Sequence, residues 1–248
     1  MEKTVLITGS SRGIGAAAAI LLASERYNIC INYNRNKTAA GHVLEKVKAC
    51  GVKAIAVQGD ISLEEDVMRI FKTIDETLGP ITALVNNAAI LLPQMRLEFM
   101  KAERVNKILM TNVTGYFLCC REAIKRMSVK KGGKGGSIVN VSSAAARLGS
   151  ANEYIDYAAS KGAVDTLTRG LSLEVAGEGI RVNGVRPGYI YTDLHAAGGE
   201  PGRVDRIKSK IPMNRGGKPE EVAQAISWFL SDKSSFCTGS FIDLAGGK

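Results

Sequence analysis

The chain has 248 residues, of which 45% are hydrophobic, and its 33 lysines and arginines outnumber 24 acidic residues to give a net charge of +9. This composition supplies a sizeable core and excludes a disordered chain, while the longest apolar runs fall short of the roughly 18–20 residues that a membrane span needs. The basic residues are scattered and accompany no recognition-helix or RNA-binding signature. We therefore expect a solvated surface or anionic small ligands, with no nucleic acid and no membrane as partner.

The cysteines and the first residues of the chain bear on its compartment. The five cysteines form no CxxC pair, and with only two histidines beside them they give no zinc-ligand spacing, so no metal site is expected. Their odd number, and the adjacency of Cys119 and Cys120, predict reduced and mostly buried thiols. The opening MEKTVLITG leads straight into a strand-like run without the pattern of a secretory leader. We expect a cytoplasmic protein.

Strand-like and helix-like segments alternate along the whole chain. Short β-branched or apolar runs predict strands at 4–8, 28–34, 53–58, 82–88, 137–143, 180–185 and 240–245. Helical patterns lie between them, at about 13–26, 38–50, 101–127 and 219–230. A further helix is expected to open with a capping-box signature at Ser62–Glu65 and to stop before Gly79. Another contains the segment 153–163 and runs to about residue 176.

Alternation of this kind predicts one α/β domain over residues 1–248. We expect a doubly wound, Rossmann-type sheet of about seven mostly parallel strands with helices on both faces. Residues 189–217 are rich in glycine, proline and charge, and we expect them to form a mobile lid over the substrate. In such folds ligands bind at the carboxyl ends of the strands.

The first of these strand ends reads TGSSRGIG (8–15). Its glycines permit a tight turn and close backbone approach, and the helix that follows offers free N–H groups and a positive dipole end to a phosphate. Such a loop alone is weak evidence, because a glycine-rich turn between strand and helix is often only a turn. Its position after the first strand favours dinucleotide binding.

The end of the second strand bears on which dinucleotide binds. About 20 residues after the glycine loop, an NAD site carries Asp or Glu to hold the ribose 2′-hydroxyl. Here the strand ends Asn34-Arg35 with no acid. A carboxylate would repel a 2′-phosphate, whereas Arg12 and Arg35 can pair with one. The alternative is that both arginines are surface groups, but the pattern favours NADP(H) over NAD.

The segment EYIDYAASKGA (153–163) offers two candidate catalytic tyrosines. A free tyrosine has a pKa near 10, too high for acid–base work at neutral pH, and a nearby ammonium lowers that pKa. Lys161 follows Tyr157 by four residues, about 6 Å along one helix face, whereas Tyr154 is about 10.5 Å away along the axis. We favour Tyr157 with Lys161 as the proton-transfer unit, and Tyr154 as a packing or pocket-wall residue.

Six motifs occur in the order typical of one enzyme family. They are TGSSRGIG (8–15), NNAA (86–89), Asn112, a serine after the fifth strand, YAASK (157–161) and RPGYIYT (186–192). The ordered set resembles the short-chain dehydrogenase/reductase family across essentially the whole chain. Two departures are mild: NNAA replaces the usual NNAG, and the serine–tyrosine interval is slightly long.

The resemblance implies a catalytic tetrad of Asn112, Ser143, Tyr157 and Lys161. Tyr157 exchanges a proton with the substrate oxygen, and Ser143 orients that oxygen, with Ser142 as the alternative serine. Lys161 tunes Tyr157 and binds the nicotinamide ribose. Asn112 is expected in a local helix distortion, holding a water that links it to Lys161.

The resemblance also implies the cofactor contacts. Asp60 corresponds to the residue that contacts adenine, Asn86 and Ala88 line the cleft, and the segment from Pro187 to Thr192 holds the carboxamide. The full set is Gly9, Ser11, Arg12, Gly13, Ile14, Gly15, Asn34, Arg35, Asp60, Ile61, Asn86, Ala88, Tyr157, Lys161, Pro187, Gly188, Ile190 and Thr192.

The implied activity is hydride transfer between NADP(H) and a carbonyl or alcohol carbon. The resemblance points to a reductase of 3-oxoacyl thioesters or other ketones, with a sugar dehydrogenase of the glucose 1-dehydrogenase type as the alternative. A non-catalytic NADP(H)-binding sensor is a remote alternative, which the intact tetrad opposes. Members of the family usually form homotetramers, so we expect a homotetramer or homodimer.

Overall fold

The computed structural model describes residues 2–248 and contains a seven-stranded sheet in which all neighbouring strands run parallel. The strand order is β3-β2-β1-β4-β5-β6-β7. After β1 the chain adds β2 and β3 on one side of it, and then crosses to add β4 and the later strands on the other side. The topological switch point of this doubly wound fold therefore lies between β1 and β4. The strands are β1 (Lys3–Ile7), β2 (Tyr27–Tyr33), β3 (Ala54–Gln58), β4 (Ala83–Asn86), β5 (Gly136–Val141), β6 (Ile180–Pro187) and β7 (Phe241–Leu244).

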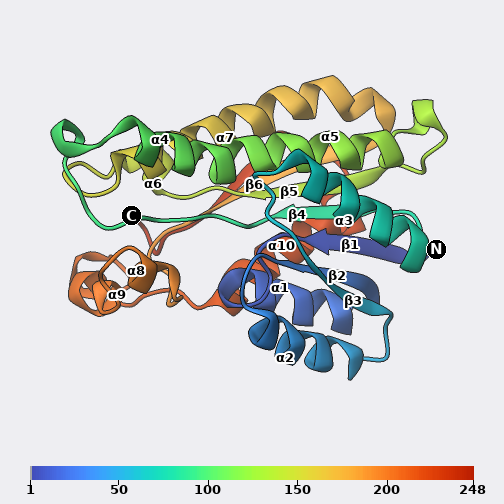
Figure 1. Ribbon diagram of the computed structural model, residues 1–248, viewed down its shortest axis with the longest axis horizontal. Helices are drawn as coiled ribbons and strands as arrows, with labels where there is room; N and C mark the ends of the chain where they lie inside the picture. Colours follow the sequence, from blue (N-terminus) through green and yellow to red (C-terminus); the bar gives the residue numbers. More distant parts are fainter. Residues whose placement is uncertain (1) are drawn as a thin grey trace.

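Helices cover both faces of this sheet (Figure 1). One face carries α1 (Gly13–Ser24), α2 (Lys37–Lys48) and α10 (Pro219–Leu230). The other carries α3 (Glu64–Thr77), α4 (Ala102–Leu109), α5 (Gly115–Met127) and α7 (Ile155–Val175). Three short helices, α6 (Ala145–Leu148), α8 (Leu194–Ala197) and α9 (Arg203–Ile207), lie toward the carboxyl end of the sheet. The predicted fold class is confirmed.

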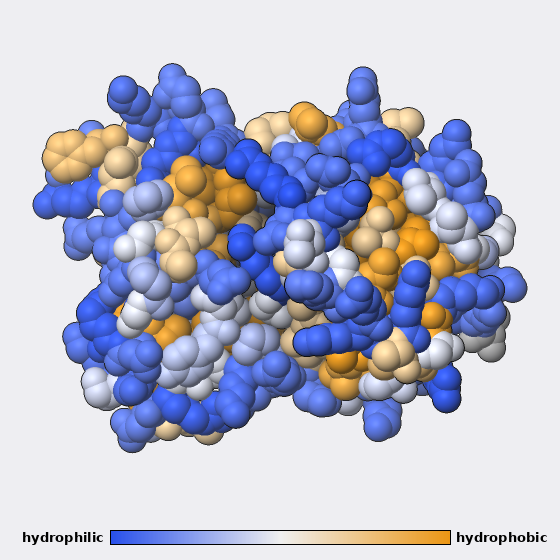
Figure 2. Space-filling model, turned by 60° about the horizontal axis from the view of Figure 1, so that its bottom comes forward, coloured by the Kyte–Doolittle hydropathy of each residue, from blue (hydrophilic) through white to orange (hydrophobic). Residues whose placement is uncertain are grey.

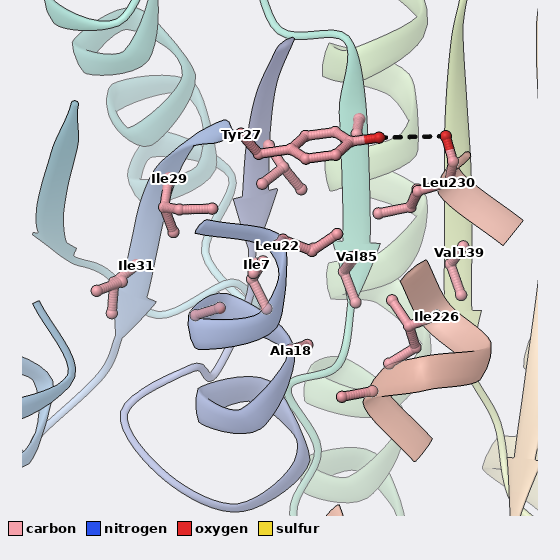
Figure 3. Close-up of a cluster of buried hydrophobic side chains, with 14 of the residues drawn as sticks. Ile7, Ala18, Leu22, Tyr27, Ile29, Ile31, Val85, Val139, Ile226 and Leu230 are labelled. Atoms are coloured by element: carbon pink, nitrogen blue, oxygen red, sulfur yellow. Dashed lines mark hydrogen bonds between the residues drawn. The ribbon is translucent and has the colours of Figure 1, made fainter. Parts of the chain in front are cut away.

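Alternate strand residues supply the two halves of the core. Ile7 of β1 and Ile29 of β2 point toward Leu22 of α1, and Ile226 of α10 packs beside them (Figure 3). The Tyr27 hydroxyl closes this layer by donating to the Leu230 carbonyl oxygen over 3.3 Å. Each fully buried aliphatic side chain of this kind contributes about 1.5–3 kcal/mol through the hydrophobic effect.

The start of α3 differs from the prediction. The N-cap residue is Leu63, and the Ser62 hydroxyl donates to Asp60 Oδ1 over 2.7 Å instead of capping the helix. The predicted capping box is wrong because the N-cap position falls on Leu63, one residue after Ser62, and leucine has no side-chain acceptor. Acidic Glu64 and Glu65 still lie in the first turn of α3, where they complement the helix dipole.

The helical stretch expected over 101–127 is interrupted by a π-helical segment at Met110–Thr114, between α4 and α5. This confirms the local distortion expected at Asn112. Single π turns inside helices are common at functional sites. Directly after the segment, Gly115 lets the helix approach Ile61 closely, because a Cβ at this position would lie 2.7 Å from Ile61 Cδ1.

The cysteines are free thiols: Cys30, Cys119 and Cys120 are buried, and Cys50 and Cys237 are half-buried. Burial raises the pKa of Cys120 to about 12, so this thiol stays protonated. Among residues 2–248, no helix has the combined length and apolarity that crossing a bilayer would require.

Candidate active site

A cavity of about 770 Å³ opens at the carboxyl ends of the strands, beside the switch point. Its walls come from the loops after β1 and β4, the ends of β2, β3 and β5, the first turns of α7, and the segment after β6. Most of the predicted cofactor contacts line it: Gly9, Ser11, Arg12, Gly13, Ile14, Asn34, Arg35, Asp60, Ile61, Ala88, Tyr157, Lys161, Pro187, Gly188, Ile190 and Thr192.

The glycine loop after β1 has the backbone shape of a phosphate cradle. Gly9 and Gly13 adopt left-handed φ values of 61° and 56°. A Cβ at Gly9 would lie 2.8 Å from Ala88 Cα, so this position requires glycine. Helix α1 begins at Gly13, and within residues 2–248 its N-cap Arg12 makes no side-chain cap. The first N–H groups of α1 are thus left for an anionic ligand, and the loop fits a dinucleotide pyrophosphate.

Two predicted contacts lie behind this wall. A Cβ at Gly15 would lie 2.6 Å from Asn87 Nδ2, so Gly15 serves packing under the loop. Asn86 is fully buried and donates to Asn140 Oδ1 over 2.9 Å. The structure corrects the expectation that Asn86 lines the cleft, and the predicted cofactor contact Gly15 is likewise not among the residues of the cavity wall. Asn87, which lines the cavity and donates to the Thr8 carbonyl oxygen over 2.9 Å, was missed because neighbouring residues along an extended chain face opposite sides.

The end of the cavity next to β2 and β3 carries two arginines and a hydrogen bond between the two strand ends. Asn34 Nδ2 donates to Asp60 Oδ2 over 2.9 Å, which ties the end of β2 to the end of β3. Arg35 lies exposed at the rim. Arg12 lies 4.0 Å from Asp193, and such a pair between exposed side chains is weak. The guanidinium groups of Arg12 and Arg35 therefore lie at the same end of the cavity as the carboxylates of Asp60 and Asp193.

Lys161 projects from α7 to the cavity with only 1% of its surface exposed. Its Nζ donates to the Val141 carbonyl oxygen over 2.7 Å and lies 5.7 Å from the centroid of the Tyr157 ring. Burial lowers the pKa of Lys161 to about 7, although the Asp165 carboxylate acts in the opposite direction. The two residues predicted as a unit therefore do lie together.

The electrostatics of Tyr157 differ from the expectation. Burial raises the pKa of its hydroxyl to about 12, and the Ser143 hydroxyl acts in the opposite direction. Lys161 alone therefore does not bring the pKa of Tyr157 toward neutrality, contrary to the expectation from the sequence. The physical reason is that burial disfavours the charged phenolate, and this effect exceeds the opposite effect of the Ser143 hydroxyl.

The two serines after β5 take different roles. Ser142 is buried, and its hydroxyl donates to the carbonyl oxygen of Lys161 over 3.2 Å. Ser143 is half-buried, accepts from the backbone N–H of Ala145 over 3.1 Å, and lies beside the hydroxyl of Tyr157. This geometry favours Ser143 over Ser142 as the serine that meets a substrate oxygen.

The chain is similar to known proteins over almost its whole length. A family model described as Enoyl-(Acyl carrier protein) reductase matches residues 9–248. An uncharacterized oxidoreductase of Escherichia coli is 65% identical over 243 residues, 98% of both chains. A solved structure of a short-chain type dehydrogenase/reductase from Mycobacterium marinum superposes with a TM-score of 0.92 at 33% identity, covering 99% of this chain and 94% of that one. The chain belongs to the short-chain dehydrogenase/reductase family.

Two further relatives of the present chain carry a substrate in their names. A 3-oxoacyl-acyl-carrier-protein reductase of Staphylococcus epidermidis is 33% identical over 247 residues, covering 100% of this chain and 99% of the relative. Glucose 1-dehydrogenase 2 of Bacillus subtilis is 35% identical over 246 residues, covering 99% and 94%.

Asn112 lies behind the cavity and not in its wall. Its side chain is fully buried, accepts from the backbone N–H of Ile90 over 2.8 Å, and donates to the Ser160 hydroxyl over 3.2 Å. These bonds join the loop after β4 to α7. The side-chain amide is thus engaged by these two groups, and the water-mediated link from Asn112 to Lys161 stays a prediction.

The segment expected as a lid, residues 189–217, folds over the cavity through α8 and α9. Arg203 of α9 is 4% exposed and pairs with Glu153, which precedes α7, and with Glu200 over 3.0 Å. Its guanidinium lies 4.9 Å from the centroid of the Tyr154 ring. The Tyr154 hydroxyl in turn donates to the Gly198 carbonyl oxygen over 3.1 Å. Tyr154 is therefore a pocket-wall residue, as predicted, whereas Arg203 was missed among the many charged residues of the segment.

Proposed function

We propose that the chain is an NADP(H)-dependent oxidoreductase that transfers a hydride between the nicotinamide and a carbonyl or alcohol carbon, with Tyr157 as the general acid/base. The observation that carries the proposal is the meeting of Tyr157, Ser143 and Lys161 in one cavity with the glycine loop of α1. Bound nicotinamide supplies the hydride chemistry, and the protein supplies geometry and electrostatics.

Each residue then has a physical task. Tyr157 gives a proton to the substrate oxygen during reduction and takes one during oxidation. Ser143 donates a hydrogen bond to the same oxygen and orients it. The Tyr157 hydroxyl, whose pKa burial raises to about 12, is protonated at neutral pH, which is the form that gives a proton during reduction. Lys161 holds positive charge near Tyr157 and, with Val141, borders the nicotinamide end of the cavity.

The preference for NADP(H) over NAD(H) is supported by the end of β2. Residues 33–36 read YNRN, so no carboxylate stands where it would hold a ribose 2′-hydroxyl. Arg35 and Arg12 line that end of the cavity, where a guanidinium can bind a 2′-phosphate through charge-assisted hydrogen bonds.

We propose a 3-oxoacyl thioester or another ketone as the substrate class. Apolar side chains of Leu91, Leu148 and Leu194 line the cavity beside Tyr154, and they suit an acyl chain. The similarity to a 3-oxoacyl-acyl-carrier-protein reductase agrees with this.

A sugar dehydrogenase remains the second candidate, and two observations favour it. One is the similarity to glucose 1-dehydrogenase 2. The other is His195, whose Nε2 bonds the Ile190 carbonyl oxygen while its buried Nδ1 has no partner among residues 2–248. That nitrogen can accept a hydrogen bond from a substrate hydroxyl.

The test is a panel of ketones, aldehydes, acetoacetyl thioesters and sugars with each nicotinamide cofactor, followed by the absorbance of the reduced nicotinamide. We expect turnover with NADPH and a ketone, and Tyr157→Phe should reduce it by about 100- to 10,000-fold while NADPH affinity stays similar. Tyr27→Phe is the control for the loss of a tyrosine hydroxyl, because Tyr27 is buried in the core, where it donates to the Leu230 carbonyl oxygen and does not line the cavity. Full turnover by Tyr157→Phe would refute the assignment.

We also propose that the protein is a cytoplasmic homotetramer or homodimer. Free thiols support a reducing compartment. Phe117 of α5 and Leu173 of α7 are 52% and 78% exposed, and exposed apolar side chains on long helices suit a subunit interface. Another face of the molecule, shown in Figure 2, carries hydrophobic patches between hydrophilic areas. Sedimentation velocity measures the state directly, and a monomer at micromolar concentration would contradict this part of the proposal.

A further inference from the structure

A second tyrosine hydroxyl lies against the catalytic lysine, and no step above uses it. Tyr116 of α5 is completely buried, two residues after the π-helical segment. It lies outside the cavity wall, so it does not contact a ligand there. Its hydroxyl lies 3.3 Å from Lys161 Nζ, and its ring centroid lies 5.1 Å from the same atom.

The hydrogen bonds around this hydroxyl have one consistent direction. Tyr116 donates to the Val141 carbonyl oxygen over 3.1 Å, so its proton is committed there. Its oxygen therefore presents a lone pair to Lys161, which donates to it and, over 2.7 Å, also to the Val141 carbonyl oxygen. The three groups form a closed triangle on the buried side of the cavity.

This triangle suits an ammonium ion better than a neutral amine. Two of the three ammonium hydrogens have acceptors inside the protein, and the third is left for a ligand in the cavity that Lys161 lines. Both the oxygen lone pair and the ring face of Tyr116 favour positive charge at Nζ. Asn112, the residue expected to reach Lys161, has its side chain engaged by Ile90 and Ser160.

We propose that Tyr116 is a positioning residue that fixes the Lys161 ammonium beside Tyr157 and keeps it charged. The proposal rests on the proposed function, in which Lys161 supplies positive charge to Tyr157. The titratable groups that face Lys161 are Tyr116 from α5 and, from α7 itself, Tyr157 and Asp165. Of these, Tyr116 and Asp165 favour the ammonium. Removal of the Tyr116 hydroxyl alone removes its bonds to Lys161 and to the Val141 carbonyl oxygen while leaving the ring in place.

The test follows the titration of Lys161 by NMR in protein labelled with ¹³C-lysine. The Lys161 signal is identified as the one that Lys161→Met lacks. In Tyr116→Phe the midpoint of this titration should move to lower pH by about one unit, because a hydrogen bond to the charged form is lost. Tyr27→Phe removes a buried hydroxyl that is remote from Lys161 and should leave the midpoint unchanged. If Tyr116→Phe does not fold, Tyr116→Met is the second variant, with the same expected direction.

A kinetic measurement on Tyr116→Phe gives the second readout. With less charge at Lys161, the phenolate of Tyr157 is harder to form, so the acidic limb of the pH profile for alcohol oxidation should move to higher pH. We expect kcat at neutral pH to fall by about 10-fold. A folded Tyr116→Phe protein with the wild-type Lys161 midpoint would overturn the proposal. The NMR titration needs no substrate, so it decides the role of Tyr116 even if the proposed reaction fails, and wild-type turnover decides the reaction separately.

Discussion

Replacing Lys161 with methionine should stabilise the fold while abolishing activity, and the stabilisation should depend on pH. Burial lowers the pKa of Lys161 from 10.5 to about 7. Between these values the unfolded chain holds a proton on this lysine that the folded chain has released. The free energy of unfolding that this group contributes therefore rises with pH from about 7 to about 10.5. Methionine has similar length, is apolar and does not titrate.

The size of the effect follows from these two pKa values. One pKa unit corresponds to about 1.4 kcal/mol, so Lys161 costs the folded state about 4 kcal/mol at pH 7 and about 2 kcal/mol at pH 9, relative to a neutral side chain. The stability advantage of Lys161→Met should accordingly shrink by about 2 kcal/mol between these pH values. The bonds from Nζ to Val141 and Tyr116 are lost at both pH values and largely cancel in this difference.

Urea unfolding of the wild type and Lys161→Met at pH 7 and pH 9, with a reductant present, measures the quantity. The other titrating groups are common to both proteins and drop out of the double difference. A difference in unfolding free energy that is the same at both pH values would show that Lys161 does not titrate in this window, and the electrostatic description of the site would be wrong.

Three further predictions concern the cofactor end, the core and the lid. Arg35→Glu should weaken NADPH binding by about 10- to 100-fold and change NADH binding by only a few-fold, measured by fluorescence titration; equal losses for both cofactors would contradict the role of Arg35. Leu22→Ala, at a fully buried position of the α1 core, should lower the urea-derived free energy of unfolding by about 2–5 kcal/mol, and a loss below about 1 kcal/mol would mean that the core refills the space. Glu153→Gln should weaken the pairing of residue 153 with Arg203 and raise the rate of limited proteolysis within residues 189–217 by about 10-fold. An unchanged rate would mean that this pair does not hold the lid.

Much of the fold was predictable because its signals are local. Alternating apolar strands and amphipathic helices recur at short spacing, and the structure confirms each of the seven predicted strands within a few residues. The glycine loop and the spacing of Tyr157 and Lys161 were likewise readable, since helix geometry places residues four apart on one face. The signal at Ser143 is ambiguous by one residue, and the bond of Ser142 to the Lys161 carbonyl oxygen favours Ser143 without testing its role.

The incorrect details depend on tertiary neighbours. Residues 86 and 87 are both asparagine, and only their positions at the end of β4 determine that Asn87 faces the cavity while Asn86 is buried. The pKa of Tyr157 is set by burial, which spacing along one helix does not reveal. Tyr116 looked like part of an apolar run, because its partners Lys161 and Val141 lie 45 and 25 residues away in the chain.

The helix that follows the π-helical segment at Met110–Thr114 makes the site sensitive to chain length as well as to residue identity. Each residue of an α-helix turns the chain by about 100° and advances it by about 1.5 Å. A π-helical turn takes up one residue more than an α-helical turn, so this segment absorbs its extra residue while α4 and α5 keep their register. An insertion between Gly115 and Tyr116, in the regular helix, would instead rotate Tyr116 by that angle away from Lys161, even though no side chain of the tetrad had changed. Such an insertion should therefore be tolerated far less well than one in a surface loop such as 130–135.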